Sequence, residues 1–215
     1  MIHLLASTLI ADAAPVRVLV YSFTVGVNNR TAETALGEYT NVTHNAASDL
    51  GTVTVSVVGL GADGGLVVNV AEQGRTNRSV APATCAIYAN TNVICGAAVV
   101  TPEETSILRS LNPKFVDPAA LDAKGHWRIA PGNGVTIDYT ATVHGDDLSI
   151  SGTRDENSPQ TTDHSEMTYT YNPAKVVTTS SHEYQTVRQL SGTQTGLTTI
   201  DVTATLTSDS LASKS

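Results

Sequence analysis

Cysteine, histidine and acidic side chains are the residues of this sequence that could bind a metal or perform redox or acid–base chemistry. The two cysteines, Cys85 and Cys95, stand at the ends of CAIYANTNVIC. Zinc sites usually need four ligands and redox motifs usually have CxxC spacing, and neither pattern accompanies this pair. If residues 89–91 form a turn, Cys85 faces Cys95 across a hairpin, close enough for a disulfide. We therefore predict a Cys85–Cys95 disulfide, with two free core thiols as the alternative.

The histidines and the paired acids form no recognisable catalytic or metal-binding pattern. His164 follows Asp163 and precedes Glu166, where a cation could bind weakly, but a solvated loop is the simpler interpretation. Asp146-Asp147 and Asp155-Glu156 could supply two carboxylates for glycoside hydrolysis, although adjacent acids are also common where strands end at turns. The sequence has no GxSxG motif. We expect no catalytic residue, no metal and no cofactor, and favour a protein that is not an enzyme.

The segments that would position any site alternate between apolar and polar residues. In GTVTVSVV, Val53, Val55 and Val57 fall on one face of an extended chain, and hydroxyl residues fall on the other. The same period recurs in TIDYTATV, EMTYTY and TTIDVTATLTS. One apolar and one polar face per strand is typical of antiparallel sheets. We predict a mainly β fold with a single antiparallel, strongly curved sheet or half-barrel, and a β-sandwich as the alternative.

Two short helices are predicted in mid-chain, near residues 102–111 and 118–124. Thr101 with Glu104 forms a capping box around Pro102, and Asp117-Pro118 repeats the same start signal. The single tryptophan, Trp127, is expected to pack a helix against the sheet. The most polar stretch, residues 153–166, is interpreted as a long mobile loop between two strands.

Composition and charge limit the partners. The chain has 215 residues and a formal net charge of −8, and its twelve basic residues are scattered. This balance argues against nucleic acid and against diffuse electrostatic binding to anionic lipid. No apolar run approaches the roughly 18–20 residues of a transmembrane helix. Residues 1–13 resemble a secretory signal peptide that ends in an A-x-A pattern, which leaves 14–215 as a single β-rich domain.

Two stretches, APATCAIYANTNVIC and LNPKFVDPAALDAKGHWRI, together with the leader and the Thr-rich strands, resemble exported bacterial β-rich proteins of unknown function. In architecture the expected fold is similar to half-barrel carriers of the lipoprotein-localisation type. That resemblance implies a curved sheet and helical lid that hold acyl chains. We therefore expect an exported protein, periplasmic or extracellular, that binds an apolar small molecule or lipid. The alternative is a structural or protein-interaction module of the cell envelope without a small-molecule ligand.

Overall fold

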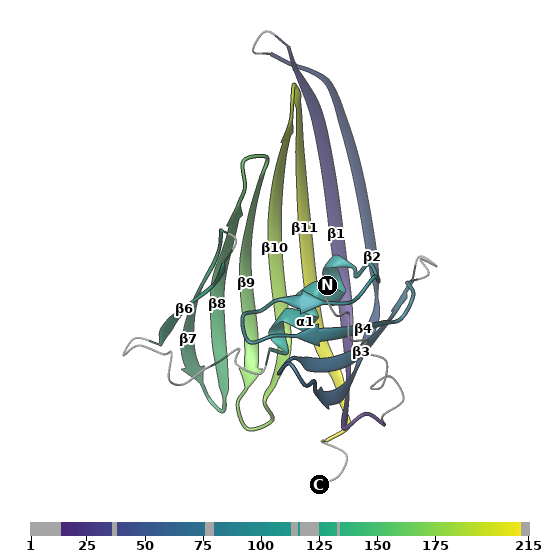
Figure 1. Ribbon diagram of the computed structural model, residues 1–215, viewed down its shortest axis with the longest axis vertical. Coiled ribbons are helices and arrows are strands. Elements are labelled where there is room, and N and C mark those ends of the chain that lie inside the picture. The colour runs from purple at the N-terminus through teal and green to yellow at the C-terminus, as the bar shows by residue number, and fades with distance from the viewer. Residues whose placement is uncertain are drawn as a thin grey trace, which may run out of the picture.

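The computed structural model describes residues 14–35, 38–75, 80–112, 116, 125–132 and 134–211. Its described strands form a single antiparallel sheet of 11 strands, curved and not closed (Figure 1). This confirms the curved single sheet and excludes the sandwich. The strands are β1 (Arg17–Ala35), β2 (Glu38–Leu60), β3 (Leu66–Gly74), β4 (Ala83–Ile87), β5 (Val93–Ile94), β6 (His126–Gly132), β7 (Val135–His144), β8 (Asp147–Asn157), β9 (Thr161–Asn172), β10 (Val177–Ser191) and β11 (Gln194–Asp209).

The strand order is β5-β4-β3-β2-β1-β11-β10-β9-β8-β7-β6. Strands that pair are therefore consecutive in sequence, except that β1 pairs with β11 in the middle of the sheet, while the consecutive strands β5 and β6 form its two edges. That β1–β11 ladder runs from Leu19 opposite Asp209 to Glu33 opposite Gln194. Interruptions of register, which add bend and twist to a sheet, lie at Val20/Tyr21, Thr31/Glu33, Val57/Gly59, Ile129/Gly132 and Thr178/Ser180.

Helix α1 (Pro102–Ser110) lies on the concave face, in contact with β1, β5, β10 and β11 (Figure 1). Its predicted capping box is present. The Thr101 hydroxyl accepts a hydrogen bond from the Glu104 N–H, and the Glu104 carboxylate accepts one from the Thr101 N–H. Ile107 and Leu108 are buried against the sheet. The second predicted helix, residues 118–124, and the predicted leader, residues 1–13, lie outside the described residues.

The apolar alternation found in the sequence builds the concave face. Val53 and Val55 are fully buried, as are Tyr21 and Leu19, which face them on β1. The main cluster around α1 comprises Leu19, Tyr21, Phe23, Val25, Val53, Val55, Val68, Val70, Ala83, Cys85, Ile87, Cys95, Ile107, Leu108, Val177, Val202 and Ala204. A second cluster on β6–β9 comprises Trp127, Ile137, Tyr139, Ile150, Met167 and Tyr169.

Trp127 anchors the second cluster and is only 2% exposed. Its indole stacks on Tyr139, with ring centroids 5.0 Å apart. The Tyr139 ring in turn lies over Gly152, where an added Cβ would come 2.5 Å from the ring. A larger residue at position 152 would displace this aromatic stack. Trp127 is thus a core residue, as predicted, but its cluster contains no residue of α1, so the expectation that it packs a helix against the sheet is not confirmed among the described residues.

Hydroxyl residues cover the convex face. Ser22 on β1 lies opposite both Thr52 on β2 and Thr205 on β11. Beyond β11, the same row continues through Ser180 and Thr170 to Ser149 and Thr142. This face has no covering layer among the described residues, so its side chains must be both β-forming and polar. Threonine meets both requirements, which explains its abundance.

The 153–166 stretch is not a loop, and this prediction was wrong. It forms the end of β8 and the start of β9, joined by a short turn at residues 158–160. Arg154 faces Ser165, and Glu156 faces Asp163, across that pair of strands. The strands are polar on both faces here, so the alternation of apolar residues that marks the other strands is absent.

The Cys85–Cys95 disulfide is present, as predicted. Ile87 pairs with Val93 between the two cysteines, and Cys85 and Cys95 are both buried in the main cluster. The bond therefore fixes the β4–β5 hairpin at one edge of the sheet, beside α1.

We predict that the Cys85→Ala/Cys95→Ala variant has a free energy of unfolding about 2–3 kcal/mol lower than the wild type, because the unfolded chain regains the entropy of a short loop. Urea unfolding under non-reducing conditions would measure the difference. As a control, dithiothreitol should lower the stability of the wild type and leave the variant unchanged. Equal responses to the reductant would contradict the prediction.

A second prediction concerns Arg17 and Asp209, which connect β1 to the end of β11. Two hydrogen bonds, at 3.1 and 2.7 Å, join the guanidinium to the carboxylate. The bonds from Arg17 lower the pKa of Asp209 below its usual value. A lowered folded-state pKa adds stability above the unfolded pKa of about 4, and that stability is lost as the pH falls through the folded value.

Asp209→Asn should therefore lower the free energy of unfolding at pH 7 by about 1 kcal/mol and flatten its decline below pH 4. Asp201→Asn is the matched control, because Asp201 lies on the same strand and its contact with His182 is exposed to solvent, with 56% of the Asp201 side chain accessible. Denaturant titrations between pH 2.5 and 7 would test this. An unchanged pH profile for Asp209→Asn would reject the role of the pair.

Candidate functional site

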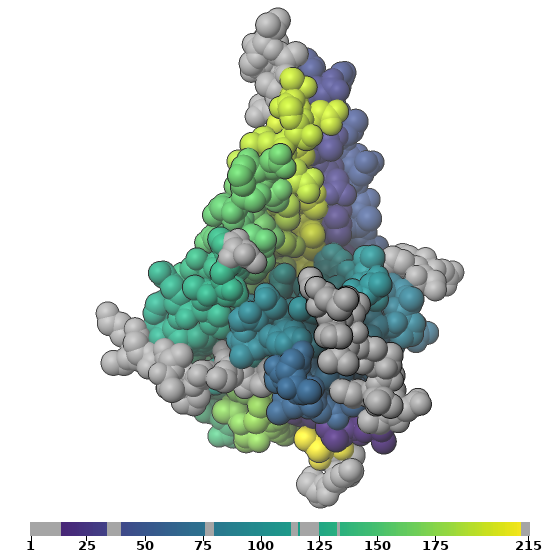
Figure 2. Space-filling model, in the orientation of Figure 1, coloured from purple at the N-terminus to yellow at the C-terminus, as the bar shows by residue number. Residues whose placement is uncertain are grey.

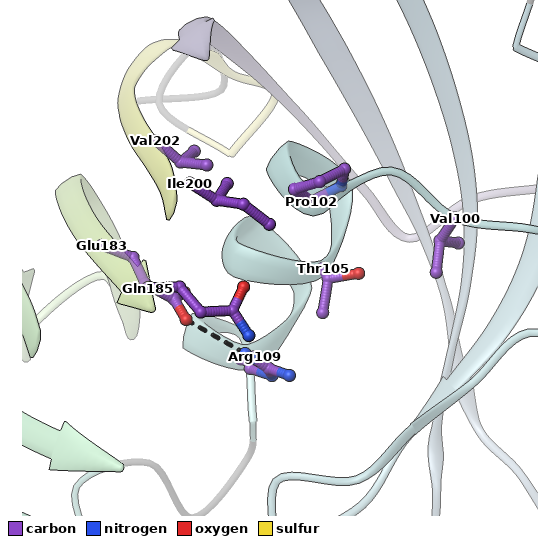
Figure 3. A pocket seen from close by; sticks show the side chains of 8 residues that line it. All are labelled: Val100, Pro102, Thr105, Arg109, Glu183, Gln185, Ile200 and Val202. Atoms are coloured by element: carbon purple, nitrogen blue, oxygen red, sulfur yellow. Dashed lines mark hydrogen bonds and ion pairs between the residues drawn. The ribbon is translucent and has the colours of Figure 1, made fainter. Parts of the chain in front are cut away.

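Two adjoining hollows on the concave face form the candidate site, and Thr105 and Arg109 of α1 line both of them. The first, of about 250 Å³, lies between α1 and strands β10 and β11 (Figure 3). The second, of about 220 Å³, lies between α1, the β4–β5 hairpin and strands β6–β8. We call the two together the helix groove.

The wall of the first hollow is apolar where α1 begins. Pro102 and Val100 lie on one side, and Ile200 and Val202 of β11 lie on the other (Figure 3). Ile200 and Val202 point inward because alternate residues of a strand share one face, as the sequence pattern predicted. Ile200 is only partly buried, so apolar surface is open to the hollow.

The opposite wall carries a buried ion pair. Arg109 Nη1 donates a hydrogen bond to Glu183 Oε1 over 3.1 Å (Figure 3). The Glu183 side chain is 5% exposed and that of Arg109 is 20% exposed. The second carboxylate oxygen, Oε2, is buried without a hydrogen-bond partner among the described residues. Because water does not reach the Glu183 carboxylate, Arg109 must compensate its charge.

A second set of charges lies next to this pair, on the concave side of β8–β10. Arg154 Nη1 donates a hydrogen bond to Asp163 over 3.1 Å, and the guanidinium also contacts Glu156. Gln185 donates a further hydrogen bond to Asp163 over 2.7 Å. Arg154 lines the second hollow and Gln185 lines the first. The polar groups of the groove are thus engaged mainly with one another.

Tyr139 of β7 and Tyr169 of β9 belong to the second apolar cluster. Burial raises the pKa of both phenols above its ordinary value of about 10. Each therefore remains protonated and uncharged under physiological conditions, and neither is suited to act as a base.

The two edges of the sheet approach each other at the second hollow. Val93 and Ile94 of β5 line one side, and Pro131 of β6 lines the other. Among the described residues, β5 pairs only with β4 and β6 pairs only with β7. The groove therefore opens at the gap between the edge strands β5 and β6, which would pair if the sheet closed into a barrel. We call this gap the seam. Helix α1 lies next to it on the concave face.

The structure separates the acids that the sequence placed side by side. Asp155 faces the convex side and lies 2.7 Å from His164 Nδ1, whereas Glu156 faces the concave side and contacts Arg154. Neighbouring strand residues point to opposite faces, so this pair cannot flank one substrate. Asp155 raises the pKa of His164, which is largely solvent-accessible. The described residues contain no group of three or more His, Cys, Asp or Glu arranged to hold a metal.

Sequence reasoning missed the charged residues of the groove. Arg154 and Asp163 fall in the stretch that was interpreted as a loop, and Arg109 and Glu183 are 74 positions apart. One signal was present: Asp163 and Ser165 continue the two-residue period of Met167 and Tyr169 toward the N-terminus. Extending the strand by this period would have placed them on the concave face.

Comparisons with known proteins identify no family. No family model matches the chain, and no curated protein matches it. A solved structure described as lipid–protein interactions in lipovitellin is similar over 91% of this chain, with a TM-score of 0.47 and 8% sequence identity. The chain spans 25% of the length of that protein. A likeness at this level assigns neither a family nor a ligand. Within the described part of the chain, no helix is long and apolar enough to cross a membrane.

We predict that Arg109→Met lowers the free energy of unfolding by about 2–4 kcal/mol, because it leaves the Glu183 carboxylate buried without its counter-charge. The double variant Arg109→Met/Glu183→Met should be more stable than Arg109→Met alone, since both charges are then removed. Urea unfolding of the two single variants and the double variant gives the coupling energy. Strictly additive effects would show that the two side chains do not stabilise each other.

Proposed function

We propose that this is an exported, non-enzymatic protein that binds the apolar part of an amphiphilic molecule in the helix groove. The main support is the combination of two adjoining hollows, an apolar wall and an open seam on the concave face. Each hollow is slightly below the usual 300–1,000 Å³ of small-molecule sites, and together they offer space for an elongated ligand.

The chemistry of the lining favours binding over catalysis. Arg109 is paired with Glu183, and Arg154 with Asp163 and Glu156. Among the described residues that line the groove, we find no nucleophile held by a base. The balance of charges suits a ligand whose polar end is uncharged and forms hydrogen bonds near Arg109 and Gln185, with its apolar end along Ile200 and Val202.

Export is part of the proposal and has two supports. The disulfide is typical of proteins that fold outside the cytosol. The leader at residues 1–13 remains a prediction from the sequence. The periplasm or the extracellular space would both suit a carrier of apolar molecules.

A second candidate function is that of an envelope interaction module. The ends of β1, β2, β10 and β11 extend farthest beyond the part of the sheet that holds α1 (Figures 1 and 2). Apolar side chains are exposed there, with Val42 at 49% and Leu190 at 58%. The open edges β5 and β6 also offer unpaired backbone groups to an added strand.

Native mass spectrometry of the protein purified from its own envelope, followed by organic extraction, separates these functions. A co-purifying lipid or other small molecule supports the carrier and identifies the ligand class. A ligand-free mass together with a stoichiometric protein partner would favour the interaction module instead.

We predict that Ile200→Glu weakens binding of the neutral probe N-phenyl-1-naphthylamine by about tenfold or more, because it places a charge on the apolar wall. Thr205→Glu is the matched control, since it puts the same residue on the same strand but on the exposed convex face. Fluorescence titration measures both affinities. Equal probe affinity in both variants would rule out the groove as the apolar site.

A further inference from the structure

Arg30 and Arg188 lie on the convex face, on the opposite side of the sheet from the groove. Arg30 of β1 pairs with Leu197 of β11, and Leu197 pairs with Arg188 of β10. All three side chains therefore leave the same face, with the two arginines two strand spacings apart. That separation is about 10 Å between backbones, which two long side chains can bridge toward a shared ligand.

Both arginines line one hollow of about 230 Å³ near the β10–β11 turn. The remaining lining residues are Ala32, Thr195 and Leu197. Ala32 is buried and Leu197 is half-buried, so the floor between the two guanidinium groups is apolar. Leu190, opposite Thr195, is 58% exposed and extends the apolar surface beyond the hollow.

Neither Arg30 nor Arg188 has a hydrogen-bonded or ion-paired partner among the described residues. By contrast, four other arginines are held by carboxylates. The residues that flank or face these arginines on the convex side include no acid: they are Asn28, His44, Thr162, Thr186, Leu190 and Thr199. The chain has a net charge of −8, but these two guanidinium groups have no acid beside them and form a local patch of positive charge. An anion between them would relieve their repulsion.

We propose that this hollow binds a phosphate group that carries an apolar substituent, as in the head of an anionic phospholipid. Guanidinium groups bind phosphate oxygens in a bidentate manner, and two of them can hold one phosphate from both sides. Ala32, Leu197 and Leu190 contact the aliphatic part. The site is independent of the helix groove, because the sheet separates them. The site is also a local contact between two arginines and one phosphate. The negative net charge of the chain opposes diffuse attraction to an anionic membrane, but it does not prevent such a local contact.

The test is an NMR titration of the full chain with monomeric dihexanoylphosphatidylglycerol, following the Nε–Hε signals of the two arginines. Arg30→Gln/Arg188→Gln should weaken binding by about 30-fold or more, because two charge-assisted contacts are lost. Arg75→Gln/Lys175→Gln is the matched control, since it removes the same charge from exposed residues elsewhere and should change affinity less than twofold. Circular dichroism and unchanged binding of N-phenyl-1-naphthylamine in the groove would show that each variant is folded.

Three results would overturn the proposal. Equal losses in the two double variants would mean diffuse attraction rather than a site. Equal affinity for dihexanoylglycerol, which has the same chains and no phosphate, would mean that the contact is apolar only. Inorganic phosphate that binds as tightly as the lipid would show that the apolar substituent contributes nothing, and that the arginines take soluble phosphate.

Discussion

The structure depends on one constraint: a single-layer sheet must bury one face with very little other material. A nine-residue helix covers the middle of the concave face, so the sheet bends around α1 to bury the remainder. The fully buried valines and aromatic residues lie on that side. The convex face receives no cover among the described residues and presents Thr and Ser in rows. The low charge and high threonine content of the chain follow from this division.

The same constraint places the helix groove. Because the sheet bends without closing, its edges β5 and β6 reach the two sides of one hollow and leave a seam. Apolar residues give way to charged ones along β10 and β8, where Glu183 and Arg154 enter the concave face. Glu183 is paired with Arg109 of α1, and Arg154 is paired with Asp163 of β9. Because each charge has a partner, both side chains can be buried on the concave face. The groove therefore has an apolar wall beside a neutralised polar wall, a lining that suits an amphiphile.

The sequence predicted the parts of the fold that depend on local pattern. Alternating valines, the capping box of α1 and the symmetric cysteine hairpin each carry their own signal within about a dozen residues. The groove could not be predicted in this way, because its ion pair joins Arg109 to Glu183 through the tertiary fold. The β8–β9 hairpin was missed for a different reason. Its inward residues, such as Arg154 and Asp163, are polar, so hydropathy no longer distinguished a strand from a loop.

The pairing of β1 with β11 has a consequence for how the protein is made. The central ladder joins residues 19–33 to residues 194–209, so β11 must be synthesised before the middle of the sheet can be completed. Contacts so distant in sequence form slowly, and the emerging chain stays unfolded or partly folded meanwhile. The middle of the sheet is therefore expected to be the last part of the fold to be completed.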